Sequence, residues 1–277
     1  MLRPRPPYSL ALSARMKSDA TRFLRDGVLT VALEAGGAPA LARVRQRPDG
    51  SLAVLLETPH PEAAVEKLRF VLAADDDHTP FLHRFADDSL LGGAIRRLRG
   101  FRPLRTATVT HALLKAVCGQ LIQAKAARLL ETRLLRSAGT PFGDLRLPPT
   151  RATFGGHSTA VLAREGLVAR KANALVRISR EWDLERLHGV ETGVAASRIA
   201  RERGLGPWSA GMVCLYGLGR FEHGLVGDLG LVKLCSGRLG RRAEAEDTQA
   251  LLAPYGEWAG LASVYLLAGG ASLSRAA

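Results

Sequence analysis

The segment Gly204-Leu205-Gly206-Pro207 of this 277-residue chain has the composition of a tight turn that opens directly into a helix. Glycine permits the positive φ angles of such a turn and has no side chain to shield the backbone. Proline suits the first helical position, because the N–H that it lacks would have no partner there. The free N–H groups at the helix start can bind a phosphate. A plain turn between two helices has the same preferences, so the motif alone leaves both interpretations open.

Asp228 is the second residue whose type and place could do chemistry. It lies 22 residues after Gly206, directly before a predicted helix that begins at Leu229. Aspartate there is a favoured N-cap, which stabilises a helix by about 1 kcal/mol. A carboxylate fixed in this way at the mouth of a cleft could also stabilise positive charge or orient a water molecule. The two roles are compatible, and the spacing favours neither.

The charge of the chain narrows the class of partner. There are 39 Lys and Arg residues against 26 Asp and Glu residues, a net charge of +13. A positive field of this size favours polyanions, with nucleic acid as the first candidate. Arginines concentrate at 96–105 and 164–180, and we expect some of them to contact phosphates.

The composition disfavours zinc proteins, disulfide-rich proteins and membrane proteins. The three cysteines, Cys118, Cys214 and Cys235, form no CxxC pair, and the histidines do not assemble with them at zinc-ligand spacing. We therefore expect no metal site and no disulfide framework. No run of about 18 apolar residues is present, so we expect a cytoplasmic protein without a membrane contact.

The elements that must position these residues fall into two parts. Alternating apolar patterns predict strands at 8–14, 27–34, 40–46 and 51–57, followed by a helix that opens at Pro61. From Pro80 onward the pattern is helical, with predicted helices at 80–99, 107–137, 158–165, 168–182, 191–202, 207–218, 229–236, 247–254 and 257–268. The predicted fold class is α+β, with an N-terminal antiparallel β-sheet domain carrying one or two helices (1–105) and a larger all-α domain (106–277).

Four segments taken together resemble the helix-hairpin-helix DNA glycosylase superfamily. They are GLGPWSA at 204–210, GDLGLVK at 227–233, GLVARKA at 166–172 and CGQL at 118–121. The β-rich first part makes the DNA-3-methyladenine glycosylase II family the most similar branch. The order of the motifs is specific, although each motif alone is not.

The resemblance implies a DNA repair enzyme. It implies a monomeric DNA glycosylase that flips an alkylated, 3-methyladenine-like base out of duplex DNA and hydrolyses its N-glycosidic bond, as in base excision repair. Asp228 corresponds to the catalytic aspartate of the family. The residues that would contact DNA by this resemblance are Gly204, Leu205, Gly206, Ser209 and Leu121. Leu121 would fill the gap left by the flipped base, with packing in a helical core as the alternative.

The resemblance also implies a base pocket and a type of chemistry. Trp208 would form one wall of the pocket, or else be a buried structural residue. Met212 and Leu267 stand at positions where the family has aromatic side chains, so the pocket would be less aromatic than that of the family. Alternatively, Met212 and Leu267 are core residues. Bifunctional relatives have a lysine nucleophile at the position of Trp208, so we expect a monofunctional enzyme.

No cofactor is expected beyond a monovalent cation held by the hairpin carbonyls. Two rival functions remain. One is a glycosylase for oxidised or mismatched bases, and the other is a non-catalytic protein that binds damaged DNA. Asp228 distinguishes an enzyme from a protein that only binds damaged DNA. A carboxylate that faces the phosphates of DNA repels them, so a protein that only binds DNA has no need of it.

Overall fold

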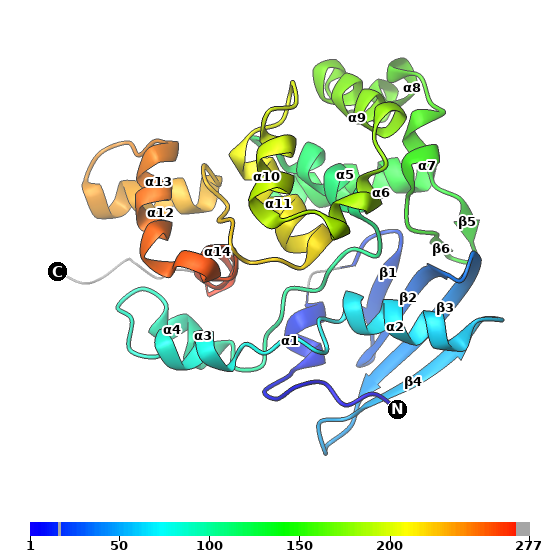
Figure 1. Ribbon diagram of the computed structural model, residues 1–277, viewed down its shortest axis with the longest axis horizontal. Helices are drawn as coiled ribbons and strands as arrows, with labels where there is room; N and C mark the ends of the chain where they lie inside the picture. The colour runs from blue at the N-terminus through cyan, green and yellow to red at the C-terminus, as the bar shows by residue number, and fades with distance from the viewer. Residues whose placement is uncertain (16–17, 270–277) are drawn as a thin grey trace.

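The computed structural model describes residues 1–15 and 18–269. An N-terminal antiparallel sheet lies beside a larger assembly of short helices, and the chain passes from one to the other near residue 104 (Figure 1). Two apolar clusters form the interior, one beneath the sheet and a larger one among the helices. The predicted α+β fold class is confirmed, while the boundary at residue 105 stays a prediction. No helix within the described ranges is long and apolar enough to cross a membrane.

The sheet is a simple meander in which each strand pairs with the next along the chain. Its strands are β1 (Arg22–Arg25), β2 (Val28–Ala35), β3 (Ala38–Gln46) and β4 (Leu52–Glu57). Helix α2 (Pro61–Val71) covers one face and buries Ala64, Leu68 and Val71 against it (Figure 1). Alternate residues of a strand point to one face, so Leu29, Val31 and Leu33 of β2 enter the same core.

Two sequence predictions for this part are wrong. Residues 8–14 were predicted as a strand, but Leu10–Ala14 form helix α1, which Ser9 begins by accepting a hydrogen bond from the N–H of Leu12 at 3.3 Å. A side-chain N-cap of this kind favours a helix even where a short apolar pattern predicts a strand. Strand β1 was not predicted, because its four residues, Arg-Phe-Leu-Arg, are too few and show no apolar alternation.

The helical part matches the predicted regions, with more interruptions. Its longer helices are α5 (Val109–Gly119), α6 (Ala124–Ala138), α9 (Ala169–Glu181), α10 (Thr192–Ala200), α12 (Leu229–Leu239), α13 (Ala245–Leu252) and α14 (Ala259–Ala268). The shorter ones are α3 (Thr79–Arg84), α4 (Gly92–Arg97), α7 (Arg151–Gly155), α8 (Thr159–Arg164) and α11 (Pro207–Val213), which continues as a π-turn at Cys214–Leu218. A small hairpin of β5 (Pro141–Phe142) and β6 (Leu145–Arg146), together with two 3-10 turns at Leu184–Gly189 and Ala253–Trp258, completes the order.

The predicted helix 107–137 is divided into α5 and α6 by a bend at residues 120–123. Leu121 in this bend has a φ of +59°, a conformation that L-residues rarely adopt. The predicted helix 80–99 is likewise divided into α3 and α4. The first bend does not follow from local preference alone, so contacts with other segments must hold it in place. The second break has a local cause, because Asp88 accepts from the N–H groups of Leu90 and Leu91.

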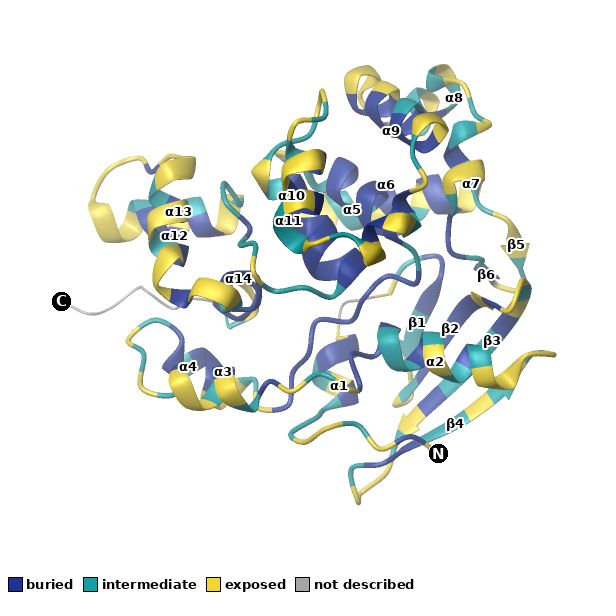
Figure 2. Ribbon diagram, in the orientation of Figure 1, coloured by how far each residue is buried: buried dark blue, intermediate teal, exposed yellow. Residues whose placement is uncertain are grey.

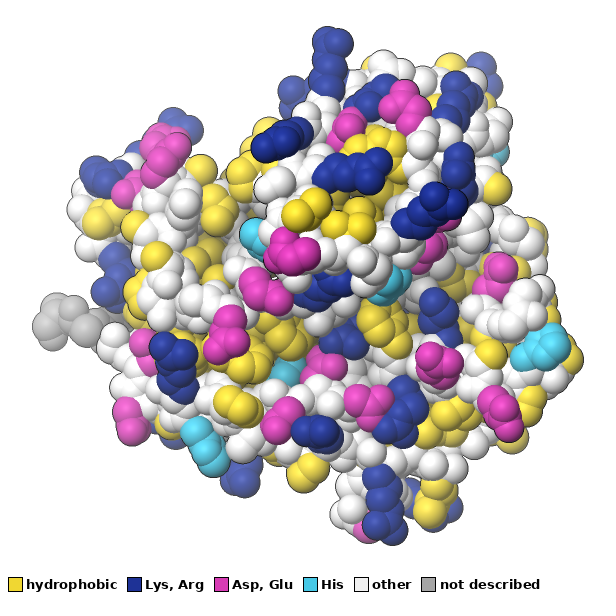
Figure 3. Space-filling view, viewed as in Figure 1, with side chains coloured by type: hydrophobic (Ala, Val, Ile, Leu, Met, Phe, Trp, Pro, Cys, Tyr) yellow, Lys and Arg dark blue, Asp and Glu magenta, His cyan; other side chains and the backbone are white. Residues whose placement is uncertain are grey.

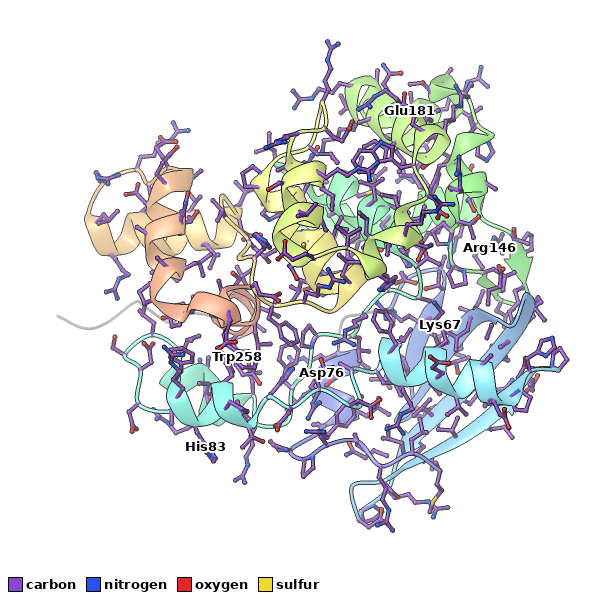
Figure 4. All side chains as sticks on the ribbon, viewed as in Figure 1. Lys67, Asp76, His83, Arg146, Glu181 and Trp258 are labelled. Carbon is purple, nitrogen blue, oxygen red and sulfur yellow. The ribbon has the colours of Figure 1, made fainter. Side chains whose placement is uncertain are left out.

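Two buried arginines lie where the two parts of the molecule meet, and Arg105 donates to the carbonyl of Gly219 in the helical part at 3.2 Å. Arg102 is fully buried, and its guanidinium donates to the carbonyls of Ala73 at 2.8 Å and Arg5 at 2.5 Å. Arg105 donates to Asp76 Oδ2 at 2.5 Å, and Asp76 lies centrally at the junction (Figure 4). Arg102 and Arg105 are therefore not among the arginines of 96–105 that could contact phosphates, because burying a charge requires partners inside the protein.

A second buried polar group joins α5 to α6, two helices with buried residues on their inner faces (Figure 2). Glu131 of α6 has Lys115 Nζ 2.8 Å from Oε2 and His111 Nε2 2.9 Å from Oε1. Burial alone would raise the pKa of Glu131, but Lys115 and His111 outweigh it and lower the pKa from 4.5 to about 2. Glu131 is thus a buried anion held by its partners.

The effect on stability follows from this depressed pKa. Since the native pKa lies below the unfolded one, Glu131 stabilises the fold above about pH 4.5, and this contribution is lost as the pH falls toward 2. Glu131→Gln should lower the free energy of unfolding by about 3 kcal/mol at pH 7, as for other broken buried ion pairs. Urea unfolding from pH 7 down to pH 3 should show the gap between variant and wild type closing. A gap that is constant with pH would contradict this assignment.

Candidate functional site

A cavity of about 820 Å³ lies where the bend after α5, the turn before α11 and the start of α12 meet. Every site residue predicted from the sequence lines it. These are Leu121, Gly204, Leu205, Gly206, Trp208, Ser209, Met212, Asp228 and Leu267. The cavity therefore brings together residues that are up to 146 positions apart in the chain.

The turn between α10 and α11 has the geometry that its glycines predict. Gly204 has a φ of +92°, so this position favours glycine, and a Cβ there would also lie 3.2 Å from that of Ala174. Gly206 is the N-cap of α11 and has an extended conformation, with no atom within 4 Å of a Cβ built on it. Its backbone is thus open to the cavity side, where another molecule can approach closely.

Gln120 holds this turn against the bend after α5. Its side-chain Nε2 donates to the carbonyl of Gly204 at 2.8 Å and to Ser209 Oγ at 3.0 Å. Its own carbonyl accepts a hydrogen bond from Lys171 Nζ at 2.7 Å. Lys171 is only 7% exposed, so it supports the bend and does not project toward solvent. The cation expected at the hairpin carbonyls stays a prediction; the carbonyl of Gly204 already accepts from Gln120.

Leu121 projects from the bend beside the cavity. Its relative exposure is 72%, one of the highest among the large apolar residues of the described chain. Core packing, the alternative left open by the sequence, is therefore wrong for this residue. A large apolar side chain held out in water by a strained backbone costs free energy, which points to a role in binding.

Asp228 stands at the rim as the N-cap of α12. Its Oδ1 accepts a hydrogen bond from the N–H of Gly230 at 2.8 Å, and its Oδ2 accepts one from Trp208 Nε1 at 3.0 Å. Both oxygens are thus fixed in orientation by donors from two different helices. The residue is half-buried and lines the cavity, so the capping role is present and the functional role stays a prediction.

Three side chains form the apolar walls. Trp208 is half-buried, and its ring passes over Gly119, where a Cβ would lie 2.6 Å from Cη2. Met212 is 8% exposed and Leu267 is 36% exposed, with Leu267 lying over the start of α12 at Gly230. Trp208 is therefore both a wall of the cavity and a partner of Asp228.

The sequence missed the polar end of the cavity. Lys115, Glu131 and Asp19 line it, together with Tyr216. Asp19 precedes β1, so the N-terminal part contributes to the site. The side-chain carboxylate of Asp19 is 4% exposed and its Oδ2 lies 3.5 Å from Arg22 Nε. These residues share no sequence motif. The one indication in the sequence was that Lys115 and Glu131 stand at positions of α5 and α6 where core residues are expected, and buried lysine and glutamate are rare.

This polar end offers ligands of the kind that bind metals. Asp19, His111 and Glu131 each place one ligand atom within 4.8 Å of the others. However, the ammonium of Lys115 already lies 2.8 Å from Glu131 Oε2. It supplies the positive charge that a metal ion would bring, and it would repel a second cation.

Known proteins were compared with the chain and its fold. No family model matches the sequence. The chain is 27% identical over 213 residues to the probable bifunctional transcriptional activator and DNA repair enzyme AlkA of Mycobacterium tuberculosis, covering 73% of this chain and 42% of that protein. It is 25% identical over 214 residues to a DNA-3-methyladenine glycosylase of Bacillus subtilis, covering 69% of this chain and 67% of the relative. This chain thus spans less than half of the Mycobacterium protein.

Solved structures agree with these relatives. The 3-methyladenine DNA-glycosylase of Archaeoglobus fulgidus has a TM-score of 0.81 at 23% identity, over 96% of each chain. The 8-oxoguanine glycosylase/lyase of Clostridium acetobutylicum, solved with double-stranded DNA, has a TM-score of 0.76 at 15% identity, over 94% of this chain and 91% of that one. The resemblance drawn from the motifs is therefore confirmed: this chain has the fold of the helix-hairpin-helix DNA glycosylases and is similar in sequence to the DNA-3-methyladenine glycosylases among them.

Proposed function

We propose that this protein is a monofunctional DNA glycosylase that hydrolyses the N-glycosidic bond of alkylated, 3-methyladenine-like bases in duplex DNA and leaves an abasic site. The observation that carries the proposal is the position of Asp228, a carboxylate fixed by two hydrogen bonds at the rim of a cavity of about 820 Å³, which can admit a base. The relatives named as 3-methyladenine glycosylases support the same activity.

Asp228 suits the chemistry of this bond. When the base departs, positive charge develops on the sugar, and an adjacent carboxylate stabilises it. The same carboxylate can orient the attacking water or accept its proton. The hydrogen bonds from Gly230 and Trp208 fix the carboxylate before substrate arrives, so little reorganisation is required in the transition state. A protein that only binds DNA has no use for such a group.

Trp208 supports hydrolysis rather than an enzyme-bound intermediate. An indole N–H stands 3.0 Å from the carboxylate of Asp228, at the position where the resemblance places a lysine in bifunctional enzymes. An indole nitrogen cannot attack the sugar, because its lone pair belongs to the aromatic ring. Water is then the nucleophile.

The hairpin and the basic surface suit binding to DNA. The open backbone at Gly206 and the first N–H groups of α11 can approach a phosphate without steric hindrance. Lys and Arg side chains are numerous over α8, α9 and α10 (Figure 3), and Arg128 and Arg170 line the cavity. The exposed Leu121 would occupy the space vacated in the duplex by a flipped base.

The carboxylate of Asp228 is the first test. Asp228→Asn should lower the rate of base release about 10²- to 10³-fold, as when a single electrostatic group is removed from other active sites. Asparagine is also a good N-cap, so the stability of the fold should change little. Methylated duplex DNA is incubated with each protein, and the released bases are quantified by chromatography. Equal release by the two proteins would overturn the proposal.

The indole N–H of Trp208 is the second test. Trp208→Phe keeps an aromatic wall but removes one of the two donors to Asp228. A hydrogen bond to a charged group contributes about 1.5–3 kcal/mol, so the single-turnover rate should fall at least tenfold. Trp182→Phe is the matched control, since Trp182 stacks with Arg198 away from the cavity. Rates that are unchanged in both variants would show that this donor is dispensable.

Leu121 is the third test. Leu121→Ala removes the projecting side chain, and the single-turnover rate of base release should fall about tenfold because a few kcal/mol of unstacking are no longer offset. Leu55→Ala on β4, which removes another exposed leucine (58% exposed) from the sheet, should leave the rate unchanged. An effect of the same size in both variants would indicate loss of general stability instead of loss of a wedge.

A further inference from the structure

Leu121 and the turn before α11 are linked through one residue, Gln120, which directly precedes Leu121. The side-chain Nε2 of Gln120 donates to the carbonyl of Gly204, 84 positions later, at 2.8 Å and to Ser209 Oγ at 3.0 Å. Gly204 precedes α11, and Ser209 is its third residue. The position of Leu121 is therefore set relative to the turn that the proposed function places against the DNA backbone.

Lys171 holds the backbone of the same bend. Gln120 ends α5 with a φ of −56° and a ψ of 120°, so its carbonyl turns away from the helix and needs a partner from another segment. Lys171, the third residue of α9, supplies it, because its Nζ donates to this carbonyl at 2.7 Å. Lys171 is only 7% exposed. A buried ammonium thus secures the peptide unit between residues 120 and 121.

Leu121 needs this support because its own conformation is unfavourable. Its φ is +59°, in the left-handed region that residues with a Cβ disfavour. Its side chain is 72% exposed, so apolar packing does little to hold it. The hydrogen bond from Lys171 fixes the orientation of the peptide unit that precedes Leu121, and this orientation limits the φ that Leu121 can adopt. Such a conformation persists only where surrounding contacts determine it.

We propose that Lys171 is a positioning residue for base flipping and that it acts through Leu121. Together with Gln120, it keeps Leu121 projecting at a fixed distance from the turn before α11. This inference rests on the proposed glycosylase function. It assigns Lys171 to the step that opens the duplex, and neither to phosphate binding nor to the chemistry at the sugar.

A fixed position matters because stacking and pairing oppose extrusion of the base. A side chain offsets this cost only when it enters the gap as the base leaves. With the turn bound to the DNA backbone, the distance between the turn and Leu121 determines where the leucine meets the base stack. Without Lys171 the unfavourable φ of Leu121 relaxes. The leucine then enters the gap less often, and release of the base slows.

The main test is a double-mutant cycle with Leu121. Single-turnover release of 3-methyladenine from duplex DNA is measured at saturating enzyme. Lys171→Met should lower the rate by up to about tenfold, the loss expected for Leu121→Ala. The double variant Lys171→Met/Leu121→Ala should lie within about twofold of Leu121→Ala alone, because two changes that remove the same effect are not additive. Losses that multiply, or an unchanged Lys171→Met rate, overturn the proposal.

Salt dependence separates positioning from phosphate binding. A lysine that neutralises a phosphate contributes about one unit to the slope of log K against log salt concentration. Lys171 is buried and bound to Gln120, so Lys171→Met should leave this slope unchanged. Binding to an undamaged duplex is measured from about 50 to about 200 mM salt. A slope that is smaller by about one unit would assign Lys171 to a phosphate and overturn the proposal.

Two variants control for the loss of charge. Lys171→Arg keeps N–H donors at the position and should restore most of the rate; a rate as low as that of Lys171→Met contradicts the proposal. Lys67→Met removes a lysine of α2 that does not line the cavity (Figure 4) and should not change the rate. An equal loss there would trace the effect to net charge and contradict the proposal as well.

A Lys171→Met protein that does not fold, recognised by loss of its cooperative urea transition, is replaced by Gln120→Met. This variant removes the side-chain link between the bend and the turn, and the same cycle with Leu121→Ala decides by the same criterion. A wild type that releases no alkylated base overturns the proposed function itself. Multiplying losses in an active enzyme overturn only the role of Lys171.

Discussion

The side chain of Gln120 joins the two segments from which the site is built. Its side-chain amide nitrogen donates to the carbonyl of Gly204 and to the hydroxyl of Ser209. The backbone carbonyl of Gln120 accepts a hydrogen bond from Lys171. The bend between α5 and α6 is fixed by these contacts, and with it the exposed position of Leu121 and the place of Gly119 beneath Trp208. The strained φ of Leu121 persists because the surrounding contacts determine it.

The sequence predicted the parts of the site whose causes are local. A glycine turn followed by proline, and an aspartate before a helix, are each specified by a few adjacent residues, and both lie at the cavity as expected. The bend at residues 120–123 could not be predicted in this way. Nothing between Val109 and Ala138 breaks a helix strongly, and the contacts that interrupt it come from residues 51 to 89 positions later.

The polar end of the cavity was missed for a related reason. Its members come from the segment before β1, from α5 and from α6, and no spacing in the chain relates Asp19 to Lys115. A charged residue within an apolar helical pattern predicts an exposed position, because the sequence does not show which residues would pair with it. Here Lys115 and His111 each bind one carboxylate oxygen of Glu131 inside the protein, so that charge is retained where apolar packing would be simpler.

Net charge is therefore an incomplete guide to where DNA would bind. Arg102, Arg105 and Lys171 all count toward +13, yet each is buried and bound to partners within the chain. The basic field that attracts a polyanion arises from the remaining exposed residues, and it falls off within about 10 Å at 0.1 M salt. Inside the protein, by contrast, Lys115 lies 2.8 Å from Glu131 where little water screens the pair, so one charge there has a larger local influence than one at the surface.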